Sequence, residues 1–217
     1  MKPALFLMLA LAVVPVHAQT PPETKISGPL ELIVATPFDQ DTPATRKGNI
    51  SGWQASIGEW MVKDGALHGD ELPEDKHPSS CTYRIDATDL VITARFRLGG
   101  AGHVAFGCRD TIAPHHHLAR TFISPDAIWI QHMSGISKTT KAVKIAEMKT
   151  PIDPEAWHTL TIEISGDHYR AKIDGHVIEA RHERFADAKG LVALIVKGQG
   201  AQFKEVTIWK AGKGKVD

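Results

Sequence analysis

Six residues capable of binding a sugar recur on neighbouring strands predicted in the middle of the chain. They are Arg95, Arg97, His103, Arg109, Arg120 and Trp129. Within the strands predicted over residues 90–98 and 103–109, the basic members alternate with apolar residues, so we expect them to share one polar face. Guanidinium groups donate paired hydrogen bonds, and an indole ring packs against a sugar ring. Gathered on a concave sheet, these six residues would form a carbohydrate groove; the alternative is an ordinary solvated face.

Three consecutive histidines, residues 115–117, raise the question of a metal site. Side chains of neighbouring residues on a strand point to opposite faces, so all three cannot face one ion. No Asp, Glu or Cys lies nearby at a recognisable ligand spacing. We therefore predict a polar loop, no bound metal and no cofactor. Serine-nucleophile and phosphate-loop motifs are absent as well.

Charge is balanced, with 25 basic and 25 acidic residues. This balance gives no indication of a nucleic-acid partner or an anionic membrane surface. Two cysteines, Cys81 and Cys108, leave two interpretations open. An exported protein could join them in a disulfide, or they are two buried thiols on separate strands. The oligomeric state is not indicated.

Residues 1–18 have the pattern of a secretory signal peptide. Lys2 precedes an apolar run over residues 4–14, and a small-residue site ends at Ala18. The run is too short to span a bilayer. We expect an exported protein, periplasmic or secreted. Its mature part would comprise a leader and first strand over residues 19–36, one domain over 37–211 and a flexible tail over 212–217.

The segment 157–181 predicts three antiparallel strands joined by two tight turns. Asp174-Gly175 is a strong hairpin signal, and Gly166-Asp167 can form the other turn. The two turns independently place the same apolar set on one face, with Arg170 between Glu163 and Glu179 on the other. A register shift of one residue would destroy both patterns.

The rest of the chain predicts roughly a dozen short strands and almost no helix, as in a sandwich or barrel. Residues 71–80 are expected to form a loop and 83–85 a short strand. Residues 141–148 have helical spacing, although their Val and Ile content also permits a strand.

Several local motifs resemble the 3-keto-disaccharide hydrolase domain family. The resemblance covers residues 37–211 and implies an all-β, concanavalin A-like jelly-roll sandwich of two antiparallel sheets, found in exported bacterial proteins. The motifs are Trp53, Gly58-Glu59-Trp60, Asp64-Gly65, the run 155–160, Ile173-Asp174-Gly175, and Phe203 followed by 206–208.

The chain departs from that family where an active site is expected. Active-looking members carry an Asn-Ser-Gly turn before a strand that ends in Arg, and then an acidic Gly-Tyr-Glu strand. Here the turn is residues 100–102, followed by His103, while Arg109 is retained and the stretch 116–120 has no carboxylate. The resemblance implies a candidate catalytic role for Arg109, and His103 is the second catalytic candidate. Strand position alone makes Arg95, Arg97, Arg120 and Trp129 candidate substrate-binding residues.

Two classes of function follow. The first is an exported domain that binds or hydrolyses a glycoside, including a 3-keto-disaccharide. The second is a non-catalytic carbohydrate-binding or structural interaction module, which the missing carboxylates favour because glycosidases usually use two. Whether the chain is an enzyme stays open at this stage.

Overall fold

The computed structural model describes residues 19–111, 116–134, 139 and 141–214. The predicted signal peptide and His115 lie outside these ranges.

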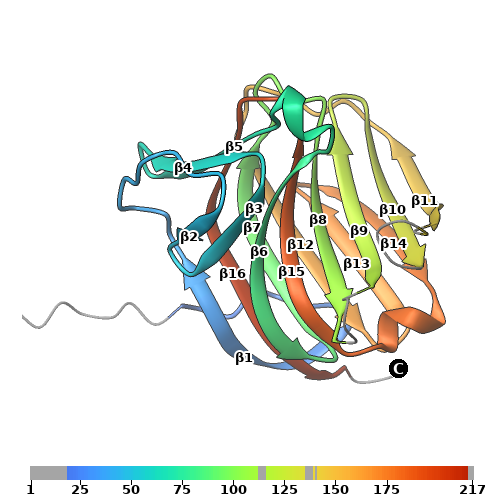
Figure 1. The fold of residues 1–217 in the computed structure, drawn as a ribbon. Helices are drawn as coiled ribbons and strands as arrows, with labels where there is room; N and C mark the ends of the chain where they lie inside the picture. Colours follow the sequence, from blue (N-terminus) through green and yellow to red (C-terminus); the bar gives the residue numbers. More distant parts are fainter. Residues whose placement is uncertain (1–18, 112–115, 135–138, 140, 215–217) are drawn as a thin grey trace, which may run out of the picture.

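Two antiparallel eight-stranded sheets pack face to face; two antiparallel sheets were predicted (Figure 1). Sheet A contains β1 (Ser27–Thr36), β4 (Glu59–Lys63), β5 (Ala66–Asp70), β7 (Leu90–Arg97), β12 (His158–Ser165), β13 (His168–Ile173), β14 (His176–Arg181) and β16 (Ala201–Lys213). Sheet B contains β2 (Gly48–Ile50), β3 (Trp53–Ile57), β6 (Ser79–Ala87), β8 (His103–Asp110), β9 (His117–Ser124), β10 (Ala127–Ser134), β11 (Lys141–Lys149) and β15 (Lys189–Lys197).

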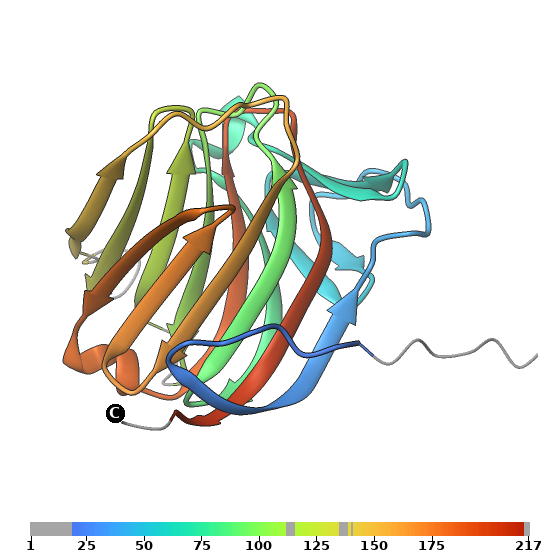
Figure 2. The ribbon, with the colours of Figure 1, turned by 180° about the vertical axis from the view of Figure 1, so that it is seen from behind.

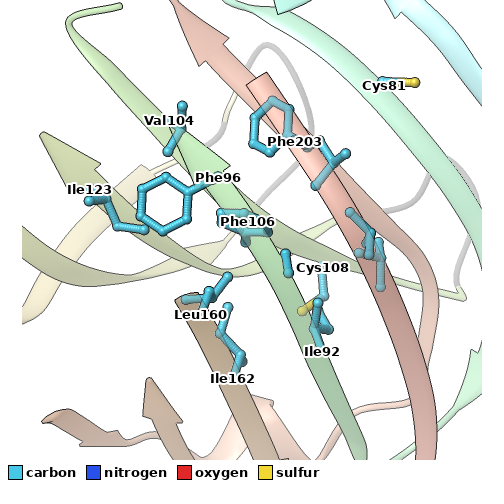
Figure 3. Packing of buried hydrophobic residues seen from close by; sticks show 14 of the residues in the cluster. Cys81, Ile92, Phe96, Val104, Phe106, Cys108, Ile123, Leu160, Ile162 and Phe203 are labelled. Carbon is cyan, nitrogen blue, oxygen red and sulfur yellow. The ribbon is translucent and has the colours of Figure 1, made fainter. Parts of the chain in front are cut away.

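Alternating apolar residues from the facing strands form the core between the two sheets. Phe96 of β7 meets Phe106 of β8 edge-on, with ring centroids 6.0 Å apart. Phe203 of β16 packs on the same Phe106 ring (Figure 3). Because the inward positions of both sheets are filled with such residues, the intervening polar residues face outward on either side of the sandwich.

The predicted meander 157–181 is confirmed in both registers. Ile162 lies opposite Ala171, which lies opposite Ile178, and all three are buried in the core. On the outer face Arg170 donates to both neighbouring carboxylates, to Glu163 at 3.1 Å and to Glu179 at 3.1 Å. The pattern holds because a two-residue turn fixes the register of each hairpin.

The segment before β1 is tied to sheet A by the buried Glu163 carboxylate. Its Oε2 accepts the backbone N–H groups of Lys25, Ile26 and Ser27 at 2.9 to 3.2 Å. The segment crosses sheet A before β1 turns to pair with β16 (Figure 2). Ser27 pairs with Lys213, so β16 continues two residues past the predicted end of the domain.

The disulfide alternative is wrong, because Cys81 and Cys108 are both free and buried. Cys81 lies on β6 and Cys108 on β8, and β15 separates these strands (Figure 3). Two strand spacings amount to about 9.6 Å, beyond the reach of a disulfide. The structure agrees with the other alternative, two buried thiols on separate strands.

Other sequence expectations need adjustment. Residues 141–148 form a strand, β11, which settles their ambiguity. β6 starts at Ser79, inside the predicted loop, because its first residues pair with β15. The partner of Ser79 is Val196, too far along the chain for local sequence to indicate it. Two short 3₁₀ helices, η1 (Pro73–Asp75) and η2 (Glu183–Ala186), were not expected.

Candidate functional site

The six predicted sugar-binding residues do not share one face. Arg95 and Arg97 lie on β7 in sheet A, whereas His103 and Arg109 lie on β8 in sheet B. The chain crosses from one sheet to the other through the turn at 98–102, so outward-facing residues on either side of it point in opposite directions. The predicted joint groove is therefore wrong. Four of the six, His103, Arg109, Arg120 and Trp129, remain together on the outer face of sheet B.

A row of polar residues runs across that outer face, perpendicular to the strands. Small residues occupy its centre, because Ala193 of β15 lies opposite Gly107 of β8. Polar side chains flank these two small residues on both sides. In strand order, each paired with the next, the row is Asn49, Gln54, Thr82, Ala193, Gly107, Arg120, Gln131 and Lys144. Amide, hydroxyl and guanidinium groups thus lie in one line across the outer face of sheet B.

Part of this face is hollowed into a groove of about 600 Å³ over β2, β3, β6, β15 and β8. Arg109 and Arg84 both line it, and the remaining polar lining consists of amides and hydroxyls. Among the described residues, no Asp or Glu side chain lines the groove. The lining residues are Asn49, Gly52, Gln54, Ser56, Ile57, Ser80, Thr82, Tyr83, Arg84, Arg109 and Leu191.

Gly107 gives Arg120 its place beside the groove. A Cβ at this glycine would come within 3.0 Å of the Arg120 Cγ, so the arginine side chain lies directly across the bare backbone of β8. From there Arg120 Nη2 donates to Nδ1 of His117 at 2.8 Å. His117 lies opposite Arg109 on the neighbouring strand. Arg109, His117 and Arg120 thus form one basic cluster at the centre of sheet B.

Burial weakens the charged forms in this cluster. Burial, together with the charges of Arg120 and Arg109, lowers the pKa of His117 to about 3. It also lowers the pKa of Arg120 to about 10. The pKa of Arg109 is lowered by burial too, and its Nε is buried without a hydrogen-bond partner. At neutral pH His117 is therefore an uncharged acceptor between two guanidinium groups.

An aromatic group stands at the far side of the row. Phe122 and Trp129 lie opposite each other and stack in parallel, with ring centroids 4.9 Å apart. His103 meets both rings edge-on, and burial lowers the pKa of its imidazole. The Lys144 ammonium lies 5.1 Å from the centre of the Trp129 ring. Trp129 was predicted as a sugar platform, but Phe122 already covers one face of its ring.

Sequence reasoning missed several residues of this site, including Gln54, Thr82, Arg84 and His117. The outward position of Gln54 could have been found, because it alternates with the buried Trp53 and Ala55. Its place in the row could not, since the pairing of β6 with β15 joins residues more than a hundred positions apart. Nothing in the sequence around His117 indicates its contact with Arg120, because that contact depends on how β9 is placed.

Neither a metal centre nor a membrane helix emerges from the described part of the chain. No three His, Cys, Asp or Glu side chains within it are placed to hold a metal ion together. His116 instead contacts Asp110, at 3.2 Å between Nδ1 and Oδ2, while His117 faces Arg120. No helix in those residues is long and apolar enough to cross a membrane.

The two antiparallel sheets and the groove across one of them define a concanavalin A-like jelly-roll domain. Within that class, residues 47–209 match the family described as the 3-keto-alpha-glucoside-1,2-lyase-like domain. The chain belongs to this family, as the local motifs suggested. It is also 30% identical over 166 residues to a levanase of Bacillus subtilis, a match that covers 73% of this chain and 23% of the levanase.

Solved structures with the same fold include both binding modules and enzymes. A carbohydrate-binding module, CBM66 from Bacillus subtilis, superposes with a TM-score of 0.61 at 20% identity, covering 74% of this chain and 96% of the module. An endo-beta-1,3(4)-glucanase of family GH16, SCLam, also has a TM-score of 0.61, at 13% identity, covering 87% and 94%. At these identities the likeness establishes the fold alone.

Proposed function

We propose that this protein is a carbohydrate-binding domain whose ligand occupies the groove across the outer face of sheet B. One observation carries the proposal: amides, hydroxyls and two arginines line the groove, with no carboxylate among its described lining residues. Such groups donate and accept hydrogen bonds in the way that sugar hydroxyls require. Family membership and the likeness to a levanase and to CBM66 agree with a sugar ligand.

The same observation argues against ordinary glycoside hydrolysis in this groove. That reaction usually needs one carboxyl group as acid and a second as base or nucleophile. Glu71, an acid near His103, is held by Lys197 at 2.6 Å and by the backbone N–H of Gly198 at 2.8 Å. With its carboxylate engaged in these contacts, Glu71 is poorly placed to transfer protons to a ligand.

A second candidate function is cleavage of a 3-keto sugar by elimination, and the basic cluster supports it. In such a step a base removes the proton on the carbon next to the ketone, and the electron pair expels the leaving sugar oxygen. Arg109 and Arg120 could stabilise the enolate. The Nδ1 lone pair of His117 already accepts from Arg120, and a pKa of about 3 makes this imidazole a weak base, so we favour binding.

Both candidates are tested with one pair of variants. Neutral oligosaccharides and a 3-keto-glucoside are screened for binding by calorimetry and for turnover, using the wild type, Arg109→Ala and Arg181→Ala. Arg181 is an exposed arginine of β14, remote from the groove. If the groove binds sugar, Arg109→Ala weakens affinity at least about tenfold and Arg181→Ala has no effect.

The outcomes separate cleanly. If the wild type cleaves the 3-keto-glucoside and Arg109→Ala lowers kcat by roughly 10² or more, the elimination is supported. Wild-type binding that survives unchanged in Arg109→Ala places the ligand elsewhere and contradicts both candidates. Thermal unfolding of each variant shows whether the fold is retained.

We further propose that the protein is exported. The support is the charged start, the apolar run and the small-residue site within residues 1–18. Mass spectrometry of the protein from its native host should find an N-terminus at Gln19. An intact Met1 would contradict export by this route.

A further inference from the structure

The outer face of sheet A, opposite the groove, carries a second group of basic side chains around one indole ring. Trp157 precedes β12, while Arg95 and Arg97 lie on β7 and Lys204 on β16. The Lys204 ammonium lies 4.2 Å from the centre of the ring, and the Arg97 and Arg95 guanidinium carbons lie 5.6 and 5.8 Å from it. We call these four residues the Trp157 cluster.

The charges of this cluster oppose its own stability. Arg95 and Lys204 are direct cross-strand partners, and like charges in that position are destabilising. Arg97 lies two positions along the same strand and therefore on the same face. Cation–π attraction to Trp157 offsets part of the repulsion. A sheet has no structural need for three cations at this point.

Little in the cluster neutralises this charge. One carboxylate, Glu205, lies 3.7 Å from Arg95 Nη1. Within the described part of the chain, Arg97 and Lys204 form no ion pair, and the Nε atoms of Arg95 and Arg97 are buried without an acceptor. The site therefore presents excess positive charge beside a half-buried aromatic ring.

We propose that the Trp157 cluster is a second ligand site, and that its ligand is an acidic polysaccharide. A carboxylate or sulfate group on the sugar would lie between the three cations and accept hydrogen bonds from their terminal N–H groups. Trp157 would pack against the ring that carries it. Charge complementarity selects the anionic group, and the indole selects a sugar over a simple polyanion.

This site is independent of the groove. The two lie on opposite outer faces of the sandwich and share no residue. A chain with both could hold one sugar in each face. Failure of either proposal leaves the other standing.

The test measures binding of the purified protein to sodium polygalacturonate, dextran sulfate, neutral dextran and polyglutamate by calorimetry at low and high salt. The variants are Arg97→Gln, Lys204→Gln, Trp157→Ala and, as a matched control, Lys172→Gln. Lys172 is an exposed lysine of β13 in the same sheet. Thermal unfolding confirms that each variant is folded.

We expect binding to at least one acidic polysaccharide, weakened at least about tenfold by each cluster variant and unchanged by Lys172→Gln. A preference for polygalacturonate identifies the anion as a carboxylate, and a preference for dextran sulfate identifies a sulfate. Affinity should fall steeply as salt is raised. Absence of binding, equal binding of dextran or polyglutamate, or an equal loss in Lys172→Gln would overturn the proposal.

Discussion

Arg120 holds His117 in its neutral form, with Nη2 of the arginine 2.8 Å from Nδ1 of the imidazole. A guanidinium can only donate, so Nδ1 must accept and cannot carry a proton. Arg109 lies on the other side as the cross-strand neighbour of His117. The one unprotonated nitrogen of this histidine is therefore occupied by Arg120, beside the Arg109 that lines the proposed sugar site.

The first prediction concerns the ionisation of His117. Burial and the two arginines lower its pKa to about 3 in the folded protein. In the unfolded chain it would be near 6.5, so between these values the unfolded state binds more protons. The stability that the neutral imidazole contributes is complete above the unfolded value and is lost as the pH falls from about 6.5 towards 3. NMR titration of labelled histidines should find one ring still neutral at pH 4.

A variant assigns that resonance and tests its cause. Arg120→Gln removes one positive charge and the Nη2 donor, so the pKa of His117 should rise towards its usual value. Arg181→Gln, an exposed arginine on the other sheet, should leave it unchanged. If His117 titrates near 6.5 in the wild type, the proposed arrangement of the cluster is wrong.

The extent of sequence-based prediction differs sharply between local and distant pairings. Asp174 and the paired residues Glu163 and Arg170 lie within one meander, whose turns span two residues each. Sequence alone therefore predicts the cross-strand pairs of this meander correctly. Arg95 and Arg109 look equivalent in sequence, since both alternate with apolar residues. Whether two successive strands pair or enter opposite sheets depends on partners far along the chain, here β12 and β16 for β7, and β15 and β9 for β8.

The site follows the same division. Sequence predicts Arg109 and Arg120 on the polar face of their strands, and both lie on the outer face of sheet B; their role in a site stays a prediction. It cannot bring Asn49 and Gln54 into one row with Ala193 and Gly107, because that row depends on three long-range registers. The bare backbone at Gly107 takes on meaning only once Arg120 is known to lie across it.

The second prediction concerns the two thiols. Burial raises the pKa of Cys81 to about 12 and that of Cys108 to about 11, and both side chains are inaccessible. Because the thiolate is the reactive form, neither should react with a thiol reagent in the folded protein. Unfolding without reductant should expose two thiols per chain. Detection of none would indicate a disulfide and contradict the placement of β15 between them.

The third prediction concerns Glu163, which is fully buried. Its carboxylate accepts three backbone N–H groups from residues 25–27 and one bond from Arg170. Glu163→Gln keeps the shape but removes the charge and turns an NH₂ group towards donors. We expect a loss of about 3–5 kcal/mol in the free energy of unfolding, as for other broken buried pairs, measured by urea denaturation.

Glu179→Gln is the matched control, since Glu179 contacts the same Arg170 from an exposed position. It should cost about 1 kcal/mol or less. Limited proteolysis should also cleave before residue 27 faster in Glu163→Gln than in the wild type. Equal stability of the two variants would show that the anchoring of the N-terminal segment contributes little.

The last prediction compares two aspartates in equivalent turns. Asp64 and Asp174 each occupy the first position of an Asp-Gly hairpin, with φ values of 51° and 49°. Asn tolerates this left-handed conformation as well as Asp does, so an Asp→Asn change isolates the carboxylate.

The Asp174 carboxylate accepts from the backbone N–H and hydroxyl of Thr159, both at 2.8 Å, and contacts His158 Nδ1 at 2.7 Å. The other ring nitrogen of His158 bonds the Asp153 carbonyl, so Asp174 fixes the loop before β12, which also carries Trp157. Among the described residues, the Asp64 side chain forms no hydrogen bond of this kind.

Asp174→Asn should therefore lower the free energy of unfolding by about 1–3 kcal/mol, and Asp64→Asn by less than about 0.5 kcal/mol. Urea denaturation of both variants measures the difference. Equal effects would mean that the turn conformation, rather than the carboxylate contacts, explains the aspartate at position 174.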